Sequence, residues 1–156
     1  AIQQLGQPDF LIHGIAMKPG KPTILSSIRG KLLITFPGYP TSALIVYYTL
    51  VDPSIRKLAH EAPYVFQQAK AHASTRFYSE IGRREFKPCR ITMDSDKRMH
   101  AIPISTGSEA ITTLVRADGF IVIPEDTEFV NEGEEVEVCI FPHRSMEINR
   151  LPGEWL

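Results

Sequence analysis

The spacing of apolar and turn-forming residues changes around Glu61-Ala62-Pro63, and this change is what most constrains the fold. Before it, short apolar runs precede a segment, Thr41 to Val51, dense enough in apolar residues for a buried helix. After it, turn-forming residues separate runs of strand length. These runs are Val65 to Ala73, Glu85 to Met93, Met99 to Ile104, Phe120 to Ile123 and Glu135 to Phe141. The sequence therefore predicts an α/β part over 1–61 and a mostly β part over 62–142, at the strand spacing of a small barrel or sandwich, with a tail or linker over 143–156.

Local signals refine the first part. Gly6 is placed to end a short helix, and Arg29-Gly30-Lys31 forms a turn between two strands of a hairpin, 23–28 and 32–36, after a strand at 10–15. Asp52 is a good N-cap and Pro53 suits the first helical position, so a second helix is predicted to begin there. In the second part, 107–116 is expected to contain one or two helical turns.

Composition excludes several classes of partner. The formal charge of -1 gives no positive field for nucleic acid. The longest apolar run, Ala43 to Val51, is about half of the ~20 residues that cross a bilayer, so no membrane span is expected. Cys89 and Cys139 have no metal-ligand spacing and are interpreted as reduced, half-buried thiols. Such thiols are consistent with a cytoplasmic protein.

The loop from Lys18 to Pro22 is the first candidate for chemistry. Two prolines restrict its backbone, Gly20 permits close approach, and the ammonium groups of Lys18 and Lys21 can converge on one oxyanion. It is not a nucleotide-binding P-loop, because Pro22 stands where that motif needs Ser or Thr. A solvated lysine turn is the competing interpretation of the same residues.

The turn from Pro37 to Ser42 is the second candidate. It leads from a strand into a helix, whose first N–H groups and partial positive charge suit a phosphate or another tetrahedral oxyanion. Ordinary helix capping by Thr41 or Ser42 is the alternative. The hairpin between the two candidates can bring them to the same end of a sheet.

Several motifs together resemble the molybdopterin molybdenumtransferase family, of the MoeA and gephyrin E-domain type. The resemblance extends from about Gln3 to Phe141 and corresponds to the C-terminal portion of that family. The matching segments are Gly14 to Pro22, Phe36 to Ala43, Gly82 to Phe86, Thr106 to Ser108, Arg116 to Gly119 and Glu132 to Val136.

This resemblance implies a fold and a reaction. The first part would be the end of a MoaB/MogA-like molybdopterin-binding α/β subdomain, and the second a small β-barrel-like subdomain. The enzyme would insert molybdate into adenylylated molybdopterin and release AMP, with Mg²⁺ assisting, as a cytoplasmic homodimer. Lys18 and Lys21 would act as catalytic charges. The residues implied in substrate binding are Lys18, Gly20, Lys21, Pro37, Gly38, Pro40, Ser42, Arg83 and Ser108.

The sequence also departs from the family pattern. Tyr39 stands where many members have Asn, and the family's Asp-bearing motifs are not found here. The acidic residues of this chain lie in turns or alternate along a strand, so no metal ligand is assigned and the Mg²⁺ ligands are expected upstream, in a longer polypeptide. The histidines show no zinc-hydrolase spacing. A noncatalytic scaffold or interaction module that retains the fold is the alternative function.

Overall fold

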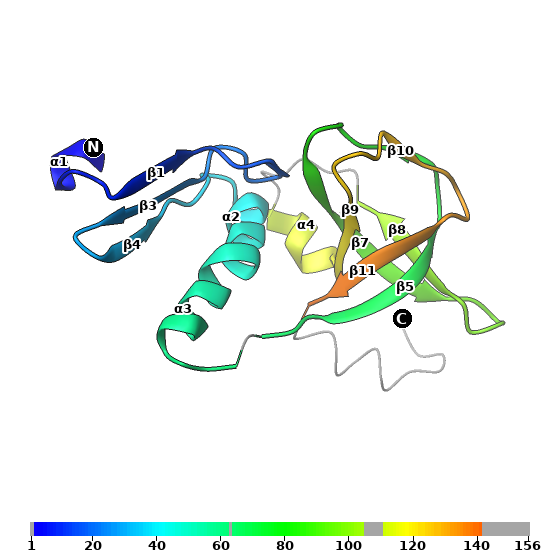
Figure 1. The fold of residues 1–156 in the computed structure, drawn as a ribbon. Helices are drawn as coiled ribbons and strands as arrows, with labels where there is room; N and C mark the ends of the chain where they lie inside the picture. Colours follow the sequence, from blue (N-terminus) through cyan, green and yellow to red (C-terminus); the bar gives the residue numbers. More distant parts are fainter. Residues whose placement is uncertain (1, 63, 105–110, 142–156) are drawn as a thin grey trace. The chain divides into compact units, whose positions relative to one another are not determined.

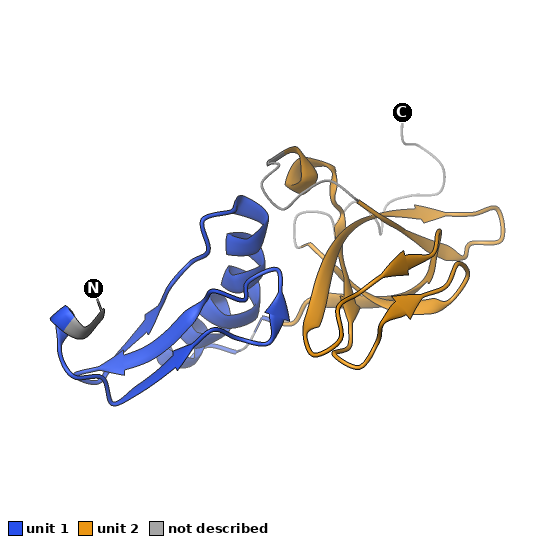
Figure 2. Cartoon of the chain, turned by 90° about the horizontal axis from the view of Figure 1, so that it is seen from above, with its two compact units in different colours: residues 1–64, 108–111 blue, residues 65–107, 112–156 orange. Residues whose placement is uncertain are grey.

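A computed structural model describes residues 2–62, 64–104 and 111–141, which separate into two compact units (Figure 2). Unit 1 contains the chain up to Tyr64, and unit 2 contains most of the chain from Val65 onward. The expected tail at 143–156 and the segment Thr106 to Ser108 lie outside the described residues.

Unit 1 contains a three-stranded antiparallel sheet in the order β1 (Phe10–His13), β3 (Ile24–Ile28) and β4 (Lys31–Ile34) (Figure 1). The predicted hairpin is confirmed. Arg29 and Gly30 both have positive φ, 53° and 71°, as a tight hairpin turn with the twist of its strands requires. The short helix α1 (Ile2–Leu5) ends at Gly6, as the sequence predicts.

A continuous helical segment follows the sheet: α2 (Pro40–Val46), the π-helical η1 (Tyr47–Val51) and α3 (Asp52–Leu58). The prediction that Asp52 caps a separate helix is wrong. Asp52 has helical angles, its N–H donates to the carbonyl of Tyr47, and its carboxylate accepts a hydrogen bond of 2.9 Å from Nε of Arg56.

Wider π-helical hydrogen bonding allows the chain to continue through Pro53, which has no N–H to donate. Nearby hydroxyl groups bond to carbonyls of the preceding turn: Oγ1 of Thr49 donates to Ile45 at 2.7 Å, and Oγ of Ser54 donates to Leu50 at 2.6 Å. The helix therefore does not have to restart at the proline.

Unit 2 is a closed five-stranded barrel, which confirms the mostly β prediction. Its strands are β5 (Gln67–Ala73), β7 (Arg84–Met93), β8 (Met99–Pro103), β9 (Gly119–Ile123) and β11 (Glu135–Ile140). They follow the order β7-β8-β5-β11-β9, and a further pairing of β7 with β9 closes the barrel (Figure 1). The pairs are antiparallel except β5 with β8, which is parallel.

Shorter elements complete unit 2. The strands β6 (Phe77–Tyr78) and β10 (Phe129–Val130) form a two-stranded ribbon that the sequence analysis does not predict. The helix α4 (Ile111–Arg116) lies within the segment expected to contain one or two helical turns.

Successive side chains along each strand point alternately into and out of the barrel, and the inward-pointing ones are apolar and fill it. The buried core includes Ala71, Phe77, Ile121, Val138 and Ile140. Glycine is required at position 119, where β9 pairs with β11, because a Cβ atom on Gly119 would collide with the carbonyl of Cys139. Both cysteines are free thiols, as predicted, but they are buried and not half-buried, because both lie on strands that pack into the barrel. Within the described ranges, no helix is both long and apolar enough to span a bilayer.

Candidate functional site

The Lys18–Pro22 loop is held by backbone hydrogen bonds at its base. N–H groups of Gly14 and Ile15 donate to the carbonyls of Thr23 and Lys21, each at 3.0 Å, and the N–H of Thr23 donates to Gly20 at 3.0 Å. The Lys18–Pro19 peptide bond is cis. The loop is therefore a turn held by backbone hydrogen bonds, and it follows the short strand β2 (Met17–Lys18).

Gly20 fixes how this loop packs. Its φ is 122°, and a Cβ atom there would lie 3.1 Å from both Sδ of Met17 and Cγ2 of Val46. Val46 is completely buried in α2, so the loop packs directly on that helix. Of the two lysines, Lys18 is half-buried and Lys21 is exposed. The convergence of their ammonium groups on one anion stays a prediction.

The second predicted segment begins α2. Pro40 is the first helical residue, and Tyr39 precedes it with extended angles (φ −85°, ψ 133°) and no side-chain cap. The side chains of Thr41 and Ser42 are only 2% and 4% exposed, whereas Tyr39 is 56% exposed. Among the described residues, Oγ1 of Thr41 has no hydrogen-bond partner.

The two segments belong to one unit and contact the same helix. The contact from Gly20 to Val46 places the loop against the far part of α2, about 9 Å along the axis from Pro40 at ~1.5 Å per residue. The loop thus contacts α2 near its C-terminal end and the second segment forms its N-terminal end, so a shared anion pocket stays a prediction.

The remaining predicted residues belong to the second half. Arg83 is half-buried and forms an ion pair with Glu80, 3.0 Å from Nη2 to Oε1. Its neighbour Arg84 pairs with Glu125 at 3.3 Å. Ser108 lies outside the described residues. The guanidinium of Arg83 therefore already has a carboxylate partner within its own turn.

A metal site would need several carboxylates or histidines close together. No group of three or more His, Cys, Asp or Glu side chains in the described ranges could hold an ion. The buried Glu85 is instead held by Nζ of Lys87 at 2.7 Å and by the hydroxyl of Ser79 at 2.8 Å. The described residues thus do not fit a resident Mg²⁺.

One cluster on the barrel, formed by Asp94, His72 and His100, is not predicted from the sequence. Nε2 of His100 lies 3.0 Å from Oδ2 of Asp94. This hydrogen bond is the main reason that the pKa of the Asp94 carboxyl lies below its ordinary value, and the backbone N–H of Arg98 adds to the effect. The two histidines are 28 positions apart, and no spacing rule predicts their approach.

Burial dominates the chemistry of both thiols. It raises the pKa of Cys89 well above its ordinary value, with the charge of Asp118 as the next cause. It also raises the pKa of Cys139 to about 11. Neither sulfur is therefore a thiolate near neutral pH, and neither is a candidate nucleophile.

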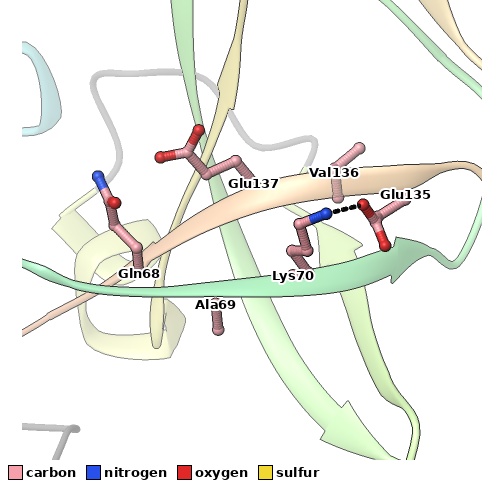
Figure 3. Close-up of a pocket in the computed structure, with 6 residues that line it drawn as sticks. All are labelled: Gln68, Ala69, Lys70, Glu135, Val136 and Glu137. Atoms are coloured by element: carbon pink, nitrogen blue, oxygen red, sulfur yellow. Dashed lines mark hydrogen bonds and ion pairs between the residues drawn. The ribbon is translucent and has the colours of Figure 1, made fainter.

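A surface pocket of about 390 Å³ lies on strands β5 and β11 of the barrel, and none of the predicted site residues is among those that line it (Figure 3). Lys70 and Glu135 form an ion pair of 2.6 Å at one side of it. The lining residues are Gln68, Ala69, Lys70, Glu135, Val136 and Glu137. Because most of these side chains are solvent-exposed and the lysine is already paired, we do not assign the functional site to this pocket.

Comparisons with known proteins agree on one family. Residues 70–141 match the model of the MoeA C-terminal region (domain IV). The chain is 30% identical to a molybdopterin biosynthesis protein of Methanocaldococcus jannaschii over 89% of this chain and 31% of that protein. It is 28% identical to the molybdopterin molybdenumtransferase of Haemophilus influenzae over 91% of this chain and 35% of that protein.

A solved structure supports the same relationship. The molybdopterin biosynthesis MoeA protein of Pyrococcus horikosii superimposes with a TM-score of 0.70 and 41% identity, over 89% of this chain and 33% of that one. The chain thus spans about a third of the length of these relatives. By motif, by sequence and by fold, it belongs to the molybdopterin molybdenumtransferase family and carries that family's C-terminal region.

Proposed function

We propose that this chain is part of a molybdopterin molybdenumtransferase, which inserts molybdate into adenylylated molybdopterin and releases AMP during molybdenum cofactor biosynthesis. The names of the relatives support the pathway. The observation that carries the proposal is the Lys18–Pro22 loop, fixed on α2 by Gly20 and presenting two cationic residues.

In this proposal Lys18 and Lys21 stabilise negative charge on molybdate and on the phosphate groups of the pterin nucleotide. They act by electrostatics and transfer no proton. Gly20 is needed for the loop to reach α2, and Pro37, Gly38, Pro40 and Ser42 shape the turn beside it. Unit 1 would then be the end of a MoaB/MogA-like subdomain.

Arg83 and Ser108 are proposed as additional substrate-binding residues. For Arg83 to bind a phosphate or molybdate oxygen, its guanidinium would have to share or leave Glu80. If a phosphate or molybdate oxygen replaced the Glu80 carboxylate, the guanidinium would still be paired with an oxyanion, so the exchange would cost little electrostatic free energy.

Further parts of the proposal concern the whole protein. We propose a cytoplasmic homodimer without nucleic acid or membrane partners. The sequence resemblance implies Mg²⁺, but the described residues do not fit it, so we derive no step through that ion.

The test uses the complete natural protein with adenylylated molybdopterin and molybdate. Lys18→Ala and Lys21→Ala should each lower the rate of molybdate insertion about 100-fold or more, as removal of a charge-stabilising group does. Arg substitutions should retain more activity than Ala. Lys31→Ala, an exposed lysine of the same unit, is the matched control. A normal rate of molybdate insertion by the Lys18→Ala/Lys21→Ala double variant would contradict the role proposed for these lysines, whereas no insertion by the natural protein would favour the scaffold alternative.

A further inference from the structure

Two histidines lie side by side on the outer face of the barrel. His72 of β5 and His100 of β8 are register partners in the parallel pair. Their chain neighbours Ala71, Ala73 and Ala101 are buried, so alternation turns both histidines outward. Adjacent strands are about 4.8 Å apart, so the two imidazoles are neighbours on the same face of the sheet.

The two rings are close but not stacked. Their centroids are 6.0 Å apart, and their planes are inclined by 47°. Both residues are half-exposed, so a small ion in solution can reach them.

Hydrogen bonds fix which nitrogen of each ring is available. Nδ1 of His72 lies 3.0 Å from the carbonyl of Gly133, which can only accept, so Nδ1 carries the proton and Nε2 keeps a lone pair. Nε2 of His100 lies 3.0 Å from the carboxylate of Asp94, which leaves the lone pair on Nδ1. Metal-binding histidines are typically oriented in this way, by a carbonyl or a carboxylate on the other nitrogen.

The separation of the rings also fits one shared ion. Metal–nitrogen bonds of ~2.0–2.1 Å, plus ~1.1 Å from nitrogen to ring centre, place two rings on one ion about 5 Å apart at a tetrahedral angle, and at most about 6.4 Å apart when the two nitrogens lie on opposite sides of the ion. The observed 6.0 Å lies between these two values, so a modest rotation of the side chains brings both rings to the separation that one shared ion needs.

We propose that His72 and His100 form a two-histidine site for a divalent transition-metal ion of the Cu²⁺, Ni²⁺ and Zn²⁺ class. Water completes the coordination, and Asp94 and the Gly133 carbonyl orient the rings. Imidazole prefers these ions to Mg²⁺ and Ca²⁺. The site has two protein ligands, in keeping with the absence of larger ligand groups in the described ranges.

This site is separate from the proposed molybdenum chemistry. It uses residues of the barrel alone, and none of the predicted substrate-binding residues takes part. Its occupancy can therefore be measured without the enzymatic reaction.

The experiment titrates the untagged 156-residue chain with Cu²⁺ by calorimetry and by electron paramagnetic resonance. We expect one tight equivalent, with a spectrum of two imidazole nitrogens. His72→Ala and His100→Ala should each weaken binding at least ~10-fold and reduce the spectrum to one nitrogen. Zn²⁺ should bind more weakly than Cu²⁺, and Mg²⁺ should not compete.

Two further variants separate metal binding from structure. Asp94→Asn should weaken Cu²⁺ binding about 10-fold while the two-nitrogen spectrum persists, because it removes only the orienting carboxylate. His60→Ala, an exposed histidine of unit 1, should leave the tight equivalent intact. Gln replacements at both positions, with circular dichroism equal to the natural chain, control for folding. Equal affinity of His72→Gln/His100→Gln and the natural chain would overturn the proposal, as would a one-nitrogen spectrum of the natural chain.

Discussion

The barrel of unit 2 closes on itself, whereas the sheet of unit 1 exposes apolar side chains on both faces of an edge strand. All four residues of β1 are exposed, among them Phe10, Leu11 and Ile12. In the barrel, residues such as Ile121 and Val138 are fully buried, and the β7–β9 pairing leaves none of the five strands at an edge. The stability of unit 2 thus comes from its own core, while the apolar residues of β1 gain little from burial within unit 1.

The largest effect is expected when one substitution in each unit is compared by its cost in unfolding free energy. Ile121→Ala removes a side chain with 0% exposure and should cost about 2–5 kcal/mol of unfolding free energy. Ile12→Ala, at a residue 49% exposed, should cost less than about 1 kcal/mol. Chemical denaturation measures both values. Hydrogen exchange should localise the loss from Ile121→Ala to the barrel, and equal costs at the two positions would break the comparison.

A smaller effect is expected where unit 1 does pack tightly. Gly20→Ala introduces a Cβ atom 3.1 Å from Met17 and Val46. Crowding of this kind should cost about 1–3 kcal/mol beyond the backbone strain. Gly30→Ala is the control, because Gly30 also has positive φ but has nothing within 4 Å of the added atom. The difference between the two unfolding free energies gives the cost of crowding together with the larger backbone strain at the φ of 122° of Gly20, and a difference of zero would mean that the loop does not rest on α2.

The smallest expected effect is on the stability of the barrel at acidic pH. The pKa of Asp94 is lowered by the hydrogen bond from His100 and then by backbone N–H groups. Because the folded-state pKa lies below the unfolded value of ~3.9, this carboxylate stabilises the barrel above about pH 4, and the contribution is lost as the pH falls through the folded-state pKa.

Asp94→Asn should therefore flatten the fall in stability between about pH 5 and pH 2, and should have its largest effect at neutral pH. The matched control is Asp96→Asn, at an exposed aspartate of the same turn. Denaturation at several pH values measures the slope. An unchanged slope in Asp94→Asn would show that this turn does not contribute to the acid sensitivity of the barrel.

Local signals predicted much of the fold. The positive φ of Arg29 and Gly30 follows from the turn between two apolar runs, and the start of α2 at Pro40 follows from the Pro-Gly turn before it. The Asp52 prediction failed because N-cap statistics describe an isolated helix start. Hydroxyl groups of neighbouring turns allowed the helix to continue through Pro53.

The candidate site was predicted less completely. The sequence identified Gly20 as a point of close approach, and the structure supplies its contact, Val46. It did not predict that Thr41 and Ser42 would be buried or that Arg83 would pair with Glu80. Those outcomes depend on how the helix and the turn pack, and residue type alone does not specify packing.

The sequence by itself determined most of the strands, the hairpin of unit 1 and the family, because neighbouring residues carry those signals. Only the tertiary structure decided the closure of β7 on β9, the parallel pairing of β5 with β8 and the approach of His72 to His100. Each of these joins residues far apart in the chain. Such pairings are selected by the packing of the whole barrel, and no local pattern encodes them.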